Sequence, residues 1–263
     1  MTTLRLIKTA LYDDMQYRTG TIIRYLSGFF FDYVKVSVWF SLVTYDTARI
    51  SFNTANATIQ YMIVVAAISA IYAANAQNSI TNSYLSGELG RRLLLPYPLL
   101  LNEAAQTIGK VLTMMCTNVF PTIILLTIIF RPEWNINIRA IPGAMLMIIL
   151  GLIFHWLLVI QIDILCFWVK ETMVLQNFRT VVYKFFSGTL IPLWFMPDFL
   201  QDVIFVLPFS KMLYYPAAYL LNMTSGPLFL KNMLVLVLWI ILLVITVTIT
   251  WKKGMKVMET FGG

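Results

Sequence analysis

Residues 184–222 read KFFSGTLIPLWFMPDFLQDVIFVLPFSKMLYYPAAYLLN, an apolar stretch that proline interrupts at four positions. Pro192 and Pro197 end one apolar segment, a short amphipathic segment follows, and Pro208 and Pro216 break the chain again. Proline is tolerated in the first turn of a helix but stops a helix when it comes later. Backbone broken in this way exists at membrane depth only where it packs against protein or faces water. Residues 191–216 are therefore predicted to form a re-entrant or interfacial element that does not cross the bilayer cleanly.

The composition of the 263-residue chain indicates a membrane protein. It is 59% hydrophobic and 12% charged, against roughly 45–50% and about 25% for soluble domains. The formal net charge of +7 is typical of basic residues that flank membrane spans, so it does not imply a nucleic-acid partner. Cys116 and Cys166 both lie in apolar runs, which argues against a disulfide framework or a zinc site.

Six stretches are long and apolar enough to span a membrane, which needs about 20 residues. The fifth is the weakest, because Arg179 and Lys184 occupy its first half. In residues 1–20, apolar and charged residues alternate at helical spacing up to Gly20, which favours an interfacial helix over a solvated tail. The prediction is one all-α membrane domain over residues 1–263, with the re-entrant element between its last two spans. The six spans are 22–45, 58–76, 110–130, 141–169, 175–195 and 233–251.

Lysine and arginine are unevenly divided between the two sets of predicted loops. One side collects 13 of the 19 basic residues and the other side five, while Lys35 lies inside the first span. Cytoplasmic loops carry the excess of lysine and arginine in multi-pass proteins. The chain is therefore predicted to have both termini in the cytoplasm.

Sequence signatures of catalysis are missing from the chain. Gly109-Lys110 has neither the first glycine nor the following hydroxyl residue of a phosphate-binding loop. The single histidine, His155, lies within a predicted span, which argues against a histidine-rich metal site or a catalytic triad. The chain is predicted not to be an enzyme and to bind no cofactor or metal itself.

Residues 78–98 read NSITNSYLSGELGRRLLLPYP and form the most informative cytoplasmic segment. Leucines alternate with charged residues in the second half of this segment, and Pro96 ends the run. A short amphipathic helix is predicted within residues 86–96, the segment expected to dock, with leucines in a groove of a partner protein and Glu88, Arg91 and Arg92 at its rim. An ordinary basic cytoplasmic loop is the alternative interpretation.

Charged residues inside membrane spans are costly, so they are candidate functional residues. Asp32 and Lys35 are three residues apart and can pair on one face of the first span. His155 and Asp163 are eight residues apart, about two turns, and share a face of the fourth span. They are predicted to take part in helix packing, and a polar path is the alternative.

Two stretches resemble the membrane subunits of type-2 ABC exporters. The sequence SGEL at residues 86–89, followed by basic, leucine and proline residues, is similar to one recognisable stretch of that family. The pattern S-G…I-P-L…P…L-P-F…P over residues 187–216 is similar to the other. Leu95 departs from the family pattern, because arginine is common at the position before this proline. The resemblance covers nearly the whole chain.

The resemblance implies two sites. The cytoplasmic loop would carry a coupling helix that docks on the ATPase subunit, with Ser86, Gly87, Glu88, Leu89, Arg91, Arg92 and Leu93. The proline-interrupted element would be an external gate built around a helix over residues 196–207, with Pro192, Pro197, Phe199, Leu200, Val203 and Pro208.

The resemblance also implies a function. It predicts export or flipping of a hydrophobic peptide, antibiotic or lipid across a bacterial inner membrane. The chain would act with a second six-span permease, identical or different, and a partner ATPase that binds ATP and Mg. Two alternatives remain from the residues themselves. One is an ion-driven secondary transporter with Asp32, Lys35 and Asp163 as coupling sites, and the other is a non-transporting immunity or sensor subunit.

Overall fold

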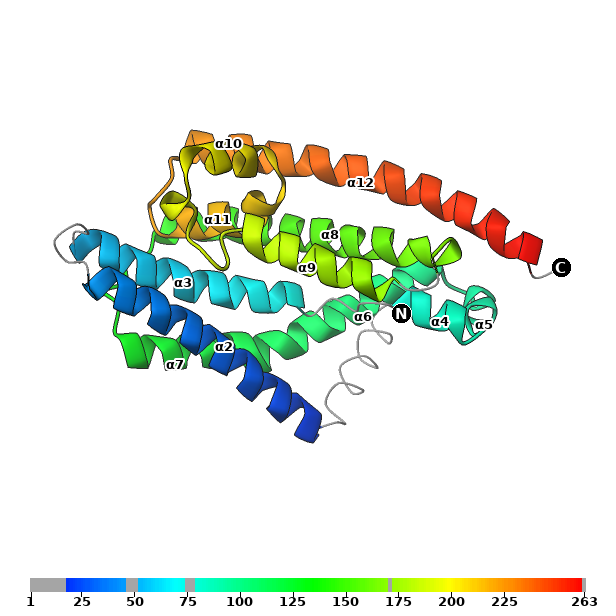
Figure 1. Ribbon diagram of the computed structural model, residues 1–263, viewed down its shortest axis with the longest axis horizontal. Helices are drawn as coiled ribbons and strands as arrows, with labels where there is room; N and C mark the ends of the chain where they lie inside the picture. The colour runs from blue at the N-terminus through cyan, green and yellow to red at the C-terminus, as the bar shows by residue number, and fades with distance from the viewer. Residues whose placement is uncertain (1–17, 46–51, 74–78, 170–171, 262–263) are drawn as a thin grey trace.

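The protein is an elongated bundle of helices in the computed structural model, which describes residues 18–45, 52–73, 79–169 and 172–261 (Figure 1). Every regular element assigned within these ranges is helical, so the predicted all-α fold is confirmed. The helices are α2 (Arg18–Tyr45), α3 (Phe52–Ala73), α4 (Ser79–Leu85), α5 (Leu89–Leu93), α6 (Leu99–Met114), α7 (Phe120–Phe130), α8 (Ile141–Ile164), α9 (Met173–Phe186), α10 (Asp198–Val206), α11 (Phe209–Leu220) and α12 (Gly226–Phe261).

Five helical segments are long and apolar enough to span a membrane, and the bent pair α10–α11 is a possible sixth. The third begins at Leu99 instead of residue 110, because α6, a π-helical turn over Met115–Val119 and α7 form one continuous segment. The N-terminal helix predicted for residues 1–20 lies outside the described residues up to position 17. Gly20 does not interrupt α2, since one glycine costs a helix only about 1 kcal/mol.

The predicted fifth span over 175–195 is wrong in its second half. Helix α9 ends at Phe186, and Gly188 follows with a φ of 82°, a left-handed conformation that favours glycine. Its 14 residues give a length of about 21 Å, shorter than a hydrocarbon core of about 30 Å. The chain then makes a short helical turn over Leu193–Phe195 before α10.

The proline-interrupted element contains two helices that are bent by 102° at their junction. Helix α10 lies between Pro197 and Pro208, as predicted. Pro216 does not break the chain, because it lies inside α11. Proline lacks the N–H that would reach the carbonyl four residues earlier, and the Tyr72 hydroxyl donates to that carbonyl, on Met212, at 2.9 Å.

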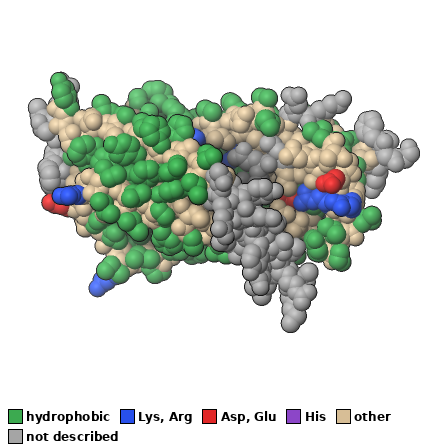
Figure 2. Space-filling view, turned by 90° about the horizontal axis from the view of Figure 1, so that it is seen from below, with side chains coloured by type: hydrophobic (Ala, Val, Ile, Leu, Met, Phe, Trp, Pro, Cys, Tyr) green, Lys and Arg blue, Asp and Glu red, His purple; other side chains and the backbone are tan. Residues whose placement is uncertain are grey.

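The core of the bundle lies among α3, α8 and α11. Its fully buried side chains include Tyr61, Met62, Tyr72, Met147 and Met212. Helix α8 contacts both α11 and α12, whereas α2 packs mainly on α3. Both α2 and α12 leave large apolar side chains exposed, and hydrophobic side chains spread over much of the face in Figure 2. This distribution suits helices that face lipid or another subunit.

Replacing Gly151 with alanine should destabilise this core. A Cβ at Gly151 would meet the Tyr72 hydroxyl and lie 3.4 Å from the Met212 Cα, and the hydrogen bond to Met212 holds the tyrosine in place. Overpacking of this kind costs about 1–3 kcal/mol. Thermal unfolding of the purified protein in detergent should show a lower midpoint. Gly90→Ala is the control, because a Cβ there meets nothing within 4 Å. Equal midpoints for the two variants would contradict this account.

Candidate functional site

The loops gather at two opposite ends of the bundle (Figure 1). At one end, Asn56 and Glu133 exchange two hydrogen bonds, of 2.8 and 2.9 Å. The Asn137 N–H donates to the Leu220 carbonyl at 2.8 Å nearby, which ties the loop after α7 to the end of α11. At the other end lie α4, α5 and the C-terminal part of α12. The predicted coupling segment and the predicted gate are therefore well separated.

The predicted coupling segment, residues 78–98, contains two short helices, and α5 is the short helix that lies within residues 86–96. Helix α4 ends at Leu85, and Gly87 turns the chain with a φ of 75° before α5. Helix α5 has only five residues, and the chain is non-helical between Leu94 and Pro98. The prolines at 96 and 98 explain the early end of α5, since the residue before a proline is disfavoured in helical conformation.

The inner side of this segment packs against the rest of the protein. Leu89 is 2% exposed and packs in one cluster with Ile80 and Leu99. It is therefore not available to a partner, contrary to the prediction. Arg92 forms an ion pair with Glu103, whose side chain is 2% exposed, and donates to the Ser83 hydroxyl at 2.6 Å. Arg92 therefore fastens the segment to α6 instead of sitting at the rim of an interface.

Within the described part of the chain, the outer side of the segment is exposed and open to a partner protein. Glu88 and Arg91 pair at 3.2 Å on the surface, with side chains 56% and 78% exposed. Leu85 and Leu94 are also exposed, Leu94 at 86%. Ser86 and Gly87 lie exposed in the turn between α4 and α5.

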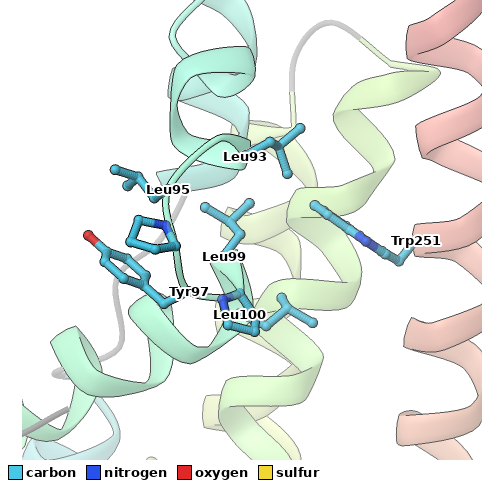
Figure 3. A pocket seen from close by; sticks show the side chains of 8 residues that line it. Leu93, Leu95, Tyr97, Leu99, Leu100 and Trp251 are labelled. Carbon is cyan, nitrogen blue, oxygen red and sulfur yellow. The ribbon is translucent and has the colours of Figure 1, made fainter. Parts of the chain in front are cut away.

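A groove of about 440 Å³ continues this surface towards α12. Leu93 and Leu95 line it from the coupling segment, and Trp251 faces them from α12 (Figure 3). Of the predicted docking leucines, Leu93 thus borders an accessible apolar groove and Leu89 does not.

A buried chain of hydrogen bonds leads from α4 into the middle of the bundle. Asp163 accepts from the Ile80 N–H at 3.2 Å and from the Gln176 side-chain amide at 3.1 Å. Gln176 in turn accepts from Arg179 Nε at 2.9 Å. Arg179 Nη1 lies 2.7 Å from His155 Nε2. The predicted packing role of His155 and Asp163 agrees with these contacts, which join the three helices α4, α8 and α9.

Sequence reasoning singled out neither Gln176 nor Arg179 as site residues. The available signal was their spacing, because Gln176, Arg179 and Tyr183 recur every three to four residues and all three are buried on one face of α9. Polar residues inside an apolar segment are candidate functional residues, as Asp163 is.

The predicted pair on α2 forms, with Lys35 Nζ 2.8 Å from the Asp32 carboxylate and side chains 14% and 16% exposed. Both residues line a cavity of about 680 Å³. His155, Arg179 and Lys184 line the same cavity from α8 and α9. The structure therefore brings Asp32, Lys35 and His155 together, whereas Asp163 lies outside the cavity lining.

The predicted external gate has an inner and an outer face. Leu200 packs with buried Leu193, Met196 and Ile204, and Pro192 and Pro208 are buried as well. Pro197 is exposed, and so are Phe199, Val203 and Val206, at 68%, 50% and 69%. These three apolar residues follow i, i+4, i+7 spacing and form one exposed stripe along α10.

Comparison with protein-family models matches residues 22–262 to the model described as ABC-2 family transporter protein. No curated protein matches the sequence.

Proposed function

Since the chain belongs to the ABC-2 family of transporter proteins, we propose that it is the membrane subunit of an ATP-driven exporter or flippase. The family match extends over most of the chain and includes both resembling stretches. A separate ATPase subunit would bind ATP and Mg and hydrolyse the nucleotide. The membrane subunit would supply the path, the docking surface and the gate.

The observation that carries this proposal is the two-sided coupling segment. Its inner side is fastened by Leu89 and the Arg92–Glu103 ion pair. Its outer side presents Glu88, Arg91 and Leu94. A docking element needs such a division, because force from a bound ATPase moves the helices only if the segment is rigidly attached to them.

The buried hydrogen bonds suggest which helices would respond. A shift of α4 pulls on Asp163 through the Ile80 N–H, and Asp163 is held to Gln176 on α9. Arg179, also on α9, borders the cavity. Movement of the docked segment would therefore reach the cavity lining through two side-chain contacts.

The orientation and assembly belong to the same proposal. The excess of basic residues supports a cytoplasmic position for the coupling segment and both termini. The exposed apolar surfaces of α2 and α12 offer area for a second permease, identical or different. An ion-driven transporter is less well supported, since Asp32 already pairs with Lys35 and Asp163 already accepts two hydrogen bonds.

The proposed docking surface can be tested by reversing the charge of one exposed residue and replacing an exposed leucine with an acid. Arg91→Glu combined with Leu94→Glu should weaken binding of the partner ATPase by roughly tenfold or more, as expected for residues central to an interface. Co-purification and titration of the ATPase against the reconstituted permease measure the effect. The matched control is Ile138→Glu with Arg139→Glu, which makes the same change at two exposed residues on the opposite end. Equal ATPase binding by both double variants would remove this surface from the mechanism.

A further inference from the structure

The cavity between α2 and α9 carries an excess of positive charge. Lys35, Arg179 and Lys184 line it with a single acid, Asp32. The Asp32 carboxylate forms an ion pair with Lys35 Nζ at 2.8 Å. Within the described part of the chain, the ion pairs that form leave Arg179 and Lys184 without a carboxylate within 4.0 Å. The formal charge of these four side chains is therefore +2, and the excess lies on the α9 side of the cavity.

Arg179 is the most informative of these groups. It is 5% exposed, and the side chains that it contacts are the neutral groups of Gln176, His155 and Thr180. The Asp163 carboxylate acts on it only from beyond ion-pairing distance, and a buried guanidinium without a directly paired anion is unfavourable. Its planar fork of donors matches the geometry of a phosphate or carboxylate. An anion bound in the cavity would offset the cost of burying it.

The rest of the lining is suited to hydrocarbon. Phe31, Val34 and Leu190 line the cavity and are 73%, 40% and 46% exposed, so the cavity is open to the surface at these residues. Phe31 and Val34 belong to the first membrane-spanning segment, which places this opening towards the bilayer. Asn118 and Thr189 add groups that can bond a hydroxyl. The volume of about 680 Å³ is typical of ligand sites, which span roughly 300–1,000 Å³.

We propose that this cavity binds an anionic phospholipid that enters from the bilayer. The phosphate lies against Arg179 and Lys184, and an acyl chain follows Phe31 and Val34 on α2. A lipid fits better than a soluble phosphate, because the apolar residues at the opening are within a membrane span. Basic pockets between membrane helices are known to bind such headgroups. Binding needs no ATPase, so it can be tested apart from the proposed transport function.

The first test is a titration of the purified full-length protein, in phosphatidylcholine nanodiscs, with fluorescent phosphatidylglycerol. Lys184→Gln should weaken binding by about tenfold, the size of a lost charge-assisted hydrogen bond, and Arg179→Gln by at least as much. Lys184 is exposed at the cavity, so its replacement does not endanger folding. Lys110→Gln is the control, since Lys110 is a basic residue of α6 outside the cavity lining.

A second measurement locates the acyl chain in the cavity. The tryptophan fluorescence added by Phe31→Trp should be quenched by phosphatidylglycerol with brominated acyl chains. Lys184→Gln in the same background should reduce this quenching. Equal affinity for phosphatidylglycerol and phosphatidylcholine would overturn the proposal. Displacement of the lipid by glycerol phosphate at similar concentration would show a soluble ligand and would overturn the lipid assignment. Weakening by Lys110→Gln equal to that by Lys184→Gln would remove the cavity as the site.

Discussion

Replacing Asp163 with alanine should disconnect the coupling segment from the bundle and suppress transport. The substitution leaves the Ile80 N–H and the Gln176 amide without their common acceptor. Each buried donor left unpaired costs about 1–3 kcal/mol. Because Asp163 is fully buried, water does not readily replace the lost acceptor. The reconstituted transporter should show a lower unfolding midpoint and ATP hydrolysis that no longer drives export.

Controls separate this effect from a general loss of an acid. Asp202→Ala removes an exposed carboxylate and should change stability by no more than about 0.5 kcal/mol. Asp163→Asn should fall between wild type and Asp163→Ala, because one of the two acceptors becomes a donor that faces another donor. The double variant with Gln176→Ala should be less damaging than the sum of the single variants, by about 0.5–3 kcal/mol. Strict additivity, or normal export by Asp163→Ala, would contradict the proposed connection.

Local sequence patterns predicted several features well, because the causes are themselves local. Pro197 and Pro208 bound α10 as expected, since a proline acts through its own ring and its missing N–H. Asp32 and Lys35 pair because three residues bring them to one helical face. Long apolar runs located the membrane helices, although α6 extends the third segment to Leu99.

Features that depend on tertiary contacts could not be predicted from local sequence patterns. Pro216 remains inside α11 because Tyr72, far away in sequence, satisfies the carbonyl of Met212. The pattern of leucines and charges over 86–96 did not reveal that Leu89 faces inward, since α5 is only five residues long and its direction is set by its contacts with α4 and by the Arg92–Glu103 ion pair to α6. The same holds for Gln176, whose partners lie on α8.

The external element gives the other large expected effect. If α10 closes the outer end of the path, as the resemblance to type-2 ABC exporters implies, its exposed stripe should meet the partner permease. Phe199 and Val203 lie on this stripe, and Leu200 faces the protein interior. A cysteine at 203 should therefore cross-link to the partner, whereas a cysteine at 200 should not. The background lacks Cys116 and Cys166, so the new cysteine is the only thiol of the chain.

The Val203→Cys cross-link should stop export almost completely, and reduction should restore it, because the link holds α10 against its counterpart. Where the two permeases differ, the second cysteine is placed at the matching position of the partner. The bend of 102° between α10 and α11, together with the packing of Leu200 and Ile204, means that α10 is fixed on one side only. Movement about this bend would then be the physical basis of gating, and a rigid link across the stripe would prevent it. Efficient cross-linking at 203 with export at the normal rate would show that α10 is a static cap.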